Sequence, residues 1–140
     1  PWYTVSVPAG WEKKQAPDEM MLLSPEKDPL TEIPEAIFSV YTHKSTGALF
    51  IEDLMQDVDE ALSRADGRVL DKGEIKIDGE VSRWVLFLNN DPPMTVMTFY
   101  IVDDFNRLTK IQFSAMAERF QDYRPMFEQW KDGFRFKKAF

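Results

Sequence analysis

The chain has 140 residues with a formal net charge of −7, and 44% of its residues are apolar. A chain of this size fits one domain that buries roughly 68–70% of the surface exposed on unfolding, and its composition is that of a globular protein rather than a disordered one. The acidic balance argues against nucleic acids and anionic membranes as partners, because clusters of Lys and Arg bind both.

The absence of cysteine narrows the possible chemistry. Disulfides, thiolate catalysis and cysteine-ligated zinc or iron–sulfur sites are excluded. The longest uninterrupted apolar run, residues 84–88, is far shorter than the roughly 20 residues that span a bilayer, so we expect no direct membrane insertion. Because the chain begins at Pro1 and not at a methionine, we expect an upstream segment that processing or cloning has removed.

Strand-like segments open the chain. Residues 2–7 alternate between two sets of side chains and stop at a Pro-Ala-Gly sequence, which predicts a short strand and a turn. The apolar run at residues 20–23 predicts a hairpin partner. Residues 26–35 hold two prolines among charged side chains and predict a surface loop, which leads into a strand at residues 36–42.

The spacing of apolar residues then changes to that of a helix, which is predicted at about residues 48–65. Apolar side chains recur at spacings of three and four, which places them on one helical face that should pack on a sheet. They are Ile51, Leu54, Met55, Val58, Ala61, Leu62 and Ala65. Gly67 is well placed to stop this helix.

A four-stranded antiparallel meander is predicted after the helix. Asp78 and Gly79 separate two β-like runs, and both residue types tolerate the positive φ of a type I′ hairpin turn. The predicted strands are residues 75–77, 81–88, 94–102 and 108–117, with polar connections at residues 89–93 and 103–107.

A second amphipathic helix is predicted at about residues 118–132, covering the sheet. Its apolar face is formed by Phe120, Tyr123, Phe127, Trp130 and Phe134. Because proline inside a helix loses a hydrogen bond, residues 118–124 are predicted to be irregular, with Pro125 near the start of the regular helix. Gly133 should end the helix, and residues 134–136 should return as an edge strand.

Two stretches of sequence carry a family resemblance. The opening strand runs into Pro8-Ala9-Gly10-Trp11, and the ending contains Tyr123-Arg124-Pro125-Met126-Phe127 before Gly133-Phe134-Arg135-Phe136. With the strand-to-helix step near residues 42–54 and the hairpin at Asp78-Gly79, the chain resembles the PsbP and Mog-type superfamily, including small bacterial lipoproteins and DcrB-like proteins. It departs from that pattern at Gly133, where such proteins usually have serine.

This resemblance implies an α+β protein: a single domain over residues 1–140, built as an α/β/α sandwich with a central antiparallel sheet. It also implies an accessory or protein-binding role. Because many members carry a lipobox cysteine upstream, the resemblance implies an extracytoplasmic protein, periplasmic or anchored through a segment that precedes Pro1. The alternative is a cytosolic adaptor or chaperone that holds a protein segment in a groove beside the sheet.

Residue sets for catalysis are missing from the sequence. His43 is the sole histidine, so neither a two-histidine metal site nor a triad with a second imidazole can form. No glycine-rich loop supports nucleotide binding, and carboxylates from one helix supply too few oxygens for calcium. We expect no catalytic residue, cofactor or metal. A carboxylate enzyme using Asp103 or Glu118 is a remote alternative.

The candidate partner-binding residues lie in polar loops and on the solvated side of the first helix. Asx residues at a turn also bond their own backbone, so Asp103 and Asp104 have a structural explanation as well. The candidates are Asn89, Asn90 and Asp91 in one loop, Asp103 and Asp104 in a turn, and Asp53 and Asp57 on the helix. A partner that binds these surfaces is expected to be a protein, and a basic one.

Overall fold

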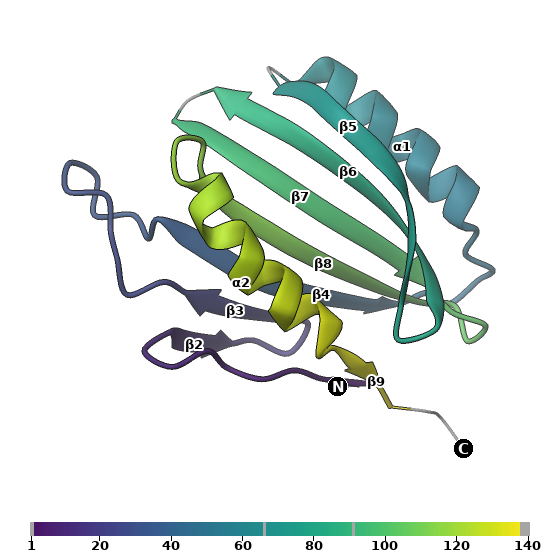
Figure 1. Cartoon of the computed structure of the whole chain (residues 1–140). Coiled ribbons are helices and arrows are strands. Elements are labelled where there is room, and N and C mark those ends of the chain that lie inside the picture. Colours follow the sequence, from purple (N-terminus) through teal and green to yellow (C-terminus); the bar gives the residue numbers. More distant parts are fainter. Residues whose placement is uncertain (1, 66, 91, 138–140) are drawn as a thin grey trace.

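A seven-stranded antiparallel sheet lies between two helices (Figure 1). The computed structural model describes residues 2–65, 67–90 and 92–137. The strands of the sheet follow the order β2-β3-β4-β8-β7-β6-β5, and β1 and β9 form a separate two-stranded ladder. The elements are β1 (Tyr3–Thr4), β2 (Glu12–Gln15), β3 (Glu19–Leu23), β4 (Ala36–Lys44), α1 (Ile51–Arg64), β5 (Gly67–Ile77), β6 (Glu80–Asn90), β7 (Pro93–Val102), β8 (Arg107–Met116), α2 (Phe120–Asp132) and β9 (Arg135–Phe136). The predicted α/β/α arrangement is confirmed.

The predicted meander is present as β5 to β8, in which each strand pairs with the next. Asp78 and Gly79 have φ values of 49° and 81°, and Ile77 pairs with Glu80 across the turn. These positive φ values at both central positions are those of a type I′ turn, whose twist matches that of the flanking strands. The observed β5 begins at Gly67, well before the predicted run.

The N-terminal strands differ from the prediction. Only Tyr3–Thr4 of the predicted opening strand is paired, and it pairs with β9 instead of joining the main sheet. The apolar run in β3 does form a hairpin, but its partner is β2, which the sequence did not predict. All side chains of β2 are exposed, so this strand has no apolar alternation to reveal it.

The predicted polar loop at residues 89–93 is mostly strand. Asn89 pairs with Met94 and Asn90 with Pro93, so β6 and β7 run nearly to the tip of their hairpin. Asn89 and Asn90 are exposed at the end of the ladder. The polar side chains predicted a loop here, but the end of a strand can also carry polar side chains where it is exposed to solvent.

The C-terminal helix corrects another prediction. α2 is continuous from Phe120 to Asp132 and contains Pro125, which does not start the regular helix. Proline removes the N–H that would bond the Gln121 carbonyl, and both residues are exposed, so water can bond this carbonyl. The predicted apolar face is buried, and Gly133 caps the helix as expected.

The two helices build separate cores on opposite faces of the sheet. α2 and β4, β7 and β8 enclose an aromatic cluster, in which Phe113 stacks on Phe127 at 4.7 Å and Trp11 stacks on Phe38 at 4.4 Å between ring centroids. α1 packs on Val85 and Tyr100 with the predicted face, but Met55 is its only buried residue among those described. The α2 side therefore holds most of the buried aromatic side chains.

Candidate functional site

The connection between β3 and β4, residues 24–35 and here named the 24–35 loop, projects away from the sheet (Figure 1). Its two arms are paired at the base. Lys27 forms an antiparallel bridge with Pro34, and the Glu35 N–H donates to the Glu26 carbonyl at 3.0 Å. The loop is therefore a small hairpin of its own.

The tip of this loop is fixed by local hydrogen bonds. Asp28 Oδ2 accepts from the Thr31 N–H at 3.0 Å and from the Thr31 hydroxyl at 2.6 Å. The Asp28 carbonyl accepts from the Glu32 N–H at 2.8 Å, and Glu32 takes a left-handed backbone conformation with φ of 59°. Asx side chains stabilise turns in this way. The tip thus has a defined shape.

Apolar side chains are presented at this tip. Leu30 is 92% exposed and Ile33 is 37% exposed. Burying one exposed leucine side chain is worth about 1.5–3 kcal/mol. Because the loop is already ordered, a partner that covers Leu30 would not meet the entropic cost of ordering the backbone.

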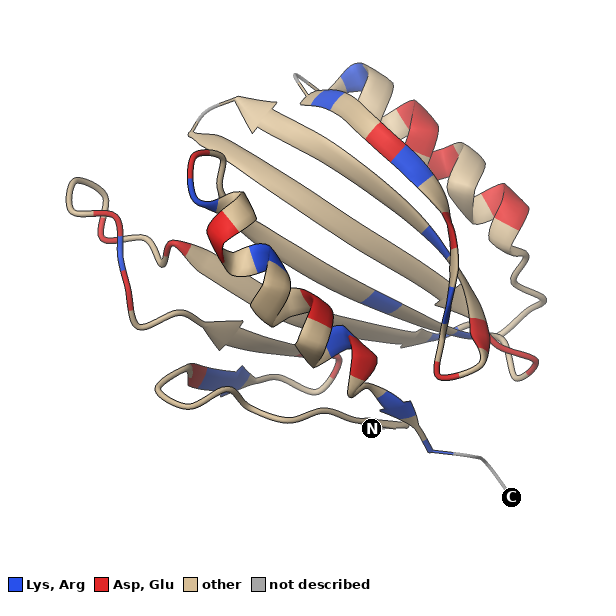
Figure 2. Cartoon of the chain, viewed as in Figure 1, with Lys and Arg blue, Asp and Glu red and all other residues tan. Residues whose placement is uncertain are grey.

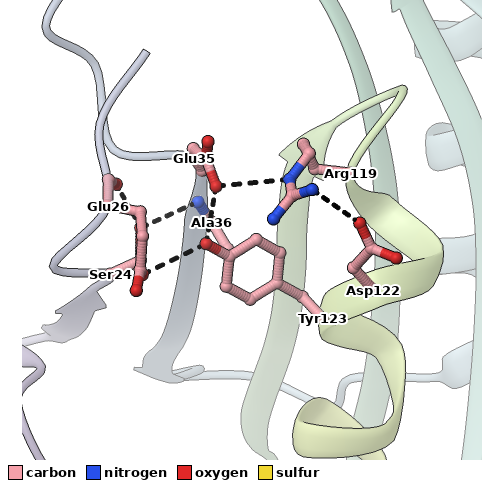
Figure 3. Close-up of polar contacts among 7 residues, drawn as sticks. All are labelled: Ser24, Glu26, Glu35, Ala36, Arg119, Asp122 and Tyr123. Atoms are coloured by element: carbon pink, nitrogen blue, oxygen red, sulfur yellow. Dashed lines mark hydrogen bonds and ion pairs between the residues drawn. The ribbon is translucent and has the colours of Figure 1, made fainter. Parts of the chain in front are cut away.

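The base of the loop is braced against α2 through Tyr123 (Figure 3). The Tyr123 hydroxyl lies 2.7 Å from Glu35 Oε2 and 3.2 Å from Glu26 Oε2, one carboxylate from each arm. Arg119 lies beside the same carboxylate, with its Nε 3.4 Å from Glu35 Oε2, and its Nη1 lies 2.9 Å from Asp122 Oδ2. The brace joins the two arms of the loop to the first turn of α2.

The electrostatics of the brace follow from burial and from the acidic side chains that surround Tyr123 and Arg119. Burial raises the pKa of Tyr123, and hydrogen bonding and charge from Glu35, then from Glu26, raise it further. The neighbouring Asp122 and then Glu35 raise the pKa of Arg119. Tyr123 therefore stays protonated as a donor, and Arg119 stays a cation that offsets the carboxylates.

The buried Ser24 fixes the root of the loop to the sheet. Its hydroxyl donates to the Glu26 carbonyl at 2.8 Å and accepts from the Ala36 N–H at 3.1 Å. The Ser24 N–H donates to the Ala36 carbonyl at 3.0 Å, which continues the ladder between β3 and β4. The loop is thus anchored at its root, its base and its tip.

A second feature is a hollow of about 300 Å³ on the sheet face that carries α1. Its lining side chains come from β3, β4 and β8, and they are Glu19, Ser39, Tyr41, Lys110 and Gln112. Burial lowers the pKa of Lys110, partly opposed by the charge of Glu19. Burial raises the pKa of the neighbouring Tyr100 to about 12. The hollow is polar and carries one partly buried cation.

Comparisons with known proteins identify the fold. Neither a family model nor a curated protein matches the sequence. Among solved structures, CyanoP, the cyanobacterial PsbP of Synechocystis, matches with a TM-score of 0.65 at 15% identity over 96% of this chain and 86% of that one. LpqN of Mycobacterium tuberculosis, involved in cell envelope biogenesis, gives 0.77 at 12% over 97% and 83%. The Ran-binding protein Mog1p of Saccharomyces cerevisiae gives 0.61 at 10% over 96% and 90%.

The chain has the PsbP/Mog fold. At these identities the likeness shows the architecture alone, and it confirms the fold that the sequence resemblance implied. The 24–35 loop of this PsbP/Mog domain leaves the sheet between β3 and β4, toward the edge of the sheet that lies farthest from β5.

The structure divides the predicted partner-binding residues of this PsbP/Mog domain between two ends of the sheet. Asp103 and Asp104 follow β7, whereas Asn89 and Asn90 lie beside the start of that strand. β7 has ten residues, so its ends are about 30 Å apart at about 3.3 Å per residue. The remaining loop candidate, Asp91, lies outside the described residues.

The turn after β7 uses Asp103 internally. Its Oδ1 accepts from the Phe105 N–H at 2.9 Å and the Arg107 N–H at 3.1 Å, and its Oδ2 lies 2.7 Å from Arg107 Nε. The side chain is only 11% exposed. The turn chemistry predicted for Asp103 is present, and the neighbouring Asp104 is exposed.

Acidic residues recur along α1, as red bands on the helix show (Figure 2). Asp53 and Asp57 are exposed, and in the part of the chain that the structure describes neither forms an ion pair. Glu52 pairs with Arg83 of β6, and Glu60 lies 3.6 Å from Arg64. As partner contacts, Asp53 and Asp57 remain predictions.

The residues considered for catalysis do not converge. Asp103 precedes β8 and Glu118 follows it, so the ten-residue strand separates the two carboxylates of the enzyme alternative. His43 is exposed near the end of β4. Within residues 2–65, 67–90 and 92–137, no three His, Asp or Glu side chains are grouped to hold a metal ion, and no helix could span a membrane.

The sequence pattern does not reveal the 24–35 loop as a site. It predicted a surface loop there, but Leu30 is one leucine among charged residues and has no periodic signal. Tyr123 was assigned correctly to the core face of α2, where it is buried. Its hydroxyl partners, Glu35 and Glu26, are 88 and 97 positions away, a separation over which no local pattern operates.

Proposed function

We propose that this PsbP/Mog-fold domain is a non-enzymatic accessory domain that binds a protein partner, and that the 24–35 loop forms the contact. The observation that carries the proposal is Leu30, which is 92% exposed at the tip of a loop held in place by Tyr123 and Ser24. Preorganised loops that present an apolar anchor favour protein recognition, because little conformational entropy is lost on binding.

A small molecule is a poorer fit for this loop than a protein surface. Ligand pockets are concave and enclose most of the ligand, whereas Leu30 and Ile33 project into solvent. A projecting apolar side chain needs a complementary cavity on the partner. The partner is therefore expected to supply an apolar pocket that receives Leu30, with polar groups at its rim.

We propose an extracytoplasmic location for the domain. The support is the likeness in fold to CyanoP and to LpqN, the latter involved in cell envelope biogenesis, together with the resemblance stated above to bacterial lipoproteins. The Ran-binding protein Mog1p has the same fold and stands for the alternative, a cytoplasmic domain. Fractionation of native cells with antibody detection separates the two: enrichment in the cytosol would overturn the extracytoplasmic proposal.

Affinity capture from native cells with paired variants tests the proposed contact. Leu30→Asp should lose the captured partner, because a carboxylate would enter its apolar pocket. The matched control is Val7→Asp, which makes the same charge change at another exposed aliphatic residue, 44% exposed and outside the strands. Loss with both variants, or with neither, would contradict binding through the loop.

The hollow beside α1 favours one second candidate function, a domain that holds a segment of another protein against the sheet. Its lining offers hydrogen-bonding side chains and the cation of Lys110. Lys110→Glu should abolish capture if the hollow is the contact, and it should leave capture intact if the 24–35 loop is the contact. The same capture experiment therefore separates the two surfaces.

A further inference from the structure

The two edge strands of the main sheet differ in how well they are protected from pairing with another chain. β2 has four residues, all exposed, and two of them are lysines. Short edges that carry lysine resist addition of a further strand. β5 has eleven residues and exposes Val69, Leu70 and Ile75. β5 also carries two lysines, Lys72 and Lys76, and a bulge between Val69 and Asp71, so the regular part of its edge that a partner strand could meet is residues 71–77.

The turn at Asp78-Gly79 decides which backbone groups of β5 point outward. Across a two-residue turn Ile77 and Glu80 exchange hydrogen bonds, so alternate residues from Ile77 back along β5 bond to β6. The residues between them, Lys72, Glu74 and Lys76, point their N–H and C=O groups away from β6. In agreement, the Lys72 N–H donates outside the ladder, to Asp71 Oδ1 at 2.9 Å.

A second copy of the same strand fits this edge. In an antiparallel pair with a two-fold axis at Gly73, Lys72 lies opposite Glu74 of the second copy, and Glu74 lies opposite its Lys72. Both residues carry outward N–H and C=O groups, so each pair would exchange two backbone hydrogen bonds once the Lys72 N–H leaves Asp71 Oδ1. Opposite charges on directly opposed residues stabilise an antiparallel pair, and the symmetry produces this pair twice.

Neighbouring registers are less favourable. An axis at Lys72 would place this lysine opposite itself, and an axis at Glu74 would oppose two glutamates. An axis at Ile75 pairs Glu74 with Lys76 over residues 73–77, where β5 ends. The register centred on Gly73 offers the same number of paired charges over residues 71–75, up to the bulge at Leu70, and the surroundings of Gly73 favour it.

Gly73 itself suits the axis. Residues opposed in a non-hydrogen-bonded pair approach to about 4.5 Å between Cα atoms, so an axis at Gly73 brings the two glycines and their surroundings this close. The Trp84 indole lies directly over Gly73, since a Cβ there would come within 2.7 Å of the ring. Two-fold symmetry would place two such indoles on the same face of the joined sheet, one on each side of the axis, where they could cover each other.

We propose that the domain forms a homodimer through antiparallel pairing of β5 with β5 of a second copy, in the register centred on Gly73. The result is one continuous sheet across both copies. The 24–35 loop of each copy would lie far from the dimer contact. The loop joins β3 and β4 near one edge of the sheet, whereas β5 forms the other edge. The dimer thus leaves the proposed partner contact free and presents it twice.

Sedimentation equilibrium over a concentration series up to about 1 mM tests this pairing, since a weaker dimer would have little specific interaction. The native chain should approach twice the monomer mass. Lys72→Glu and Glu74→Lys should each raise the dissociation constant about tenfold or more, because both symmetry-related pairs become repulsive. Mixing these two variants should restore a dimer, because each then supplies the charge that the other lacks.

Lys76→Glu is the matched control, with the same charge change on the same strand. It should leave the dimer intact, because the proposed register pairs residues 71–75 and Lys76 lies beyond them, level with the bulge of the second copy. Circular dichroism of each variant checks that the fold is retained. A native chain that stays monomeric throughout, a mixture that fails to restore the dimer, or Lys76→Glu dissociating it as strongly as Lys72→Glu would each overturn the proposal.

Discussion

Tyr123 shows how one side chain links the core of this protein to its exposed loop. Its ring lies 6.2 Å from Trp11 in an edge-on contact, and its hydroxyl lies between two carboxylates. A phenol has one proton, so the shorter contact, to Glu35, takes the hydrogen bond. The 3.6-residue period predicts the buried ring from sequence. The hydroxyl contacts depend on where the chain returns in space, which no local spacing encodes.

Tyr123→Phe tests this link through stability and its dependence on pH. At neutral pH the loss of one partly buried hydrogen bond should lower the free energy of unfolding by about 1 kcal/mol. Because the pKa of Tyr123 is raised above its ordinary 10, the folded chain keeps a proton that the unfolded chain releases. Native stability should therefore fall as pH rises above about 10.

Urea unfolding of both proteins between pH 7 and 11 measures this effect. The pKa of Tyr100 and that of Tyr3 are also raised, mainly by burial, but both residues are present in both proteins. The difference between the two curves isolates Tyr123 and should shrink above pH 10. A constant difference across this range would contradict the contribution assigned to the hydroxyl.

For α1, the apolar pattern predicts the helix but not how deeply its side chains are buried. The apolar stripe gave the correct face, yet Leu54 is only half-buried, whereas the next residue, Met55, is 6% exposed. Amphipathic spacing reports direction toward a core and not how deeply the helix is covered. The same limit applies to α2, where the rule against internal proline did not account for a solvent-facing carbonyl.

Substitutions in α1 should rank accordingly. Met55→Ala should cost about 2–5 kcal/mol of unfolding free energy, the range for buried large side chains. Leu54→Ala should cost less, about 2 kcal/mol, because part of its side chain already contacts water. Denaturant melts of both variants provide the comparison. If Leu54→Ala proved the more costly, the packing of α1 described here would be wrong.

The hairpin between β5 and β6 depends on positive φ at Gly79. Gly79→Val should destabilise the fold by about 1–3 kcal/mol, because a β-branched residue is strained at φ of 81°. Gly79→Asn is the matched control, since asparagine tolerates this region, and it should cost clearly less. No atom lies within 4 Å of a Cβ placed there, so thermal melts of the two variants compare strain and not crowding.

For the molecule as a whole, the arrangement of one sheet between two helices was predicted better than the candidate site. The turn signal, the helical period and the family resemblance together led to the sheet and its two helices. The projecting 24–35 loop was not identified as a site, because its distinctive property is the exposure of a leucine, which only the packed structure defines. The acidic surface was visible from composition, and its distribution required the structure.

The acidic side of α1 remains a predicted contact for a basic partner. Charge reversal at Asp53 and Asp57 should slow association and reduce its dependence on salt, because exposed charges are screened over about 8 Å at physiological ionic strength. Asp104→Lys is the suitable test at the β7–β8 turn, since Asp103 holds that turn together. Stopped-flow association at two salt concentrations measures both. Unchanged rates in every variant would exclude an acidic contact.

The proposed contact requires that a protein partner covers Leu30. The most direct measurement is site-specific photo-crosslinking in native cells, with a photoreactive residue in place of Leu30 and, as the control, in place of Asp59 on the exposed side of α1. We expect one discrete crosslinked protein from position 30, lost in competition with excess native chain but not with Leu30→Asp. No crosslink from position 30, or the same product from position 59, would contradict it.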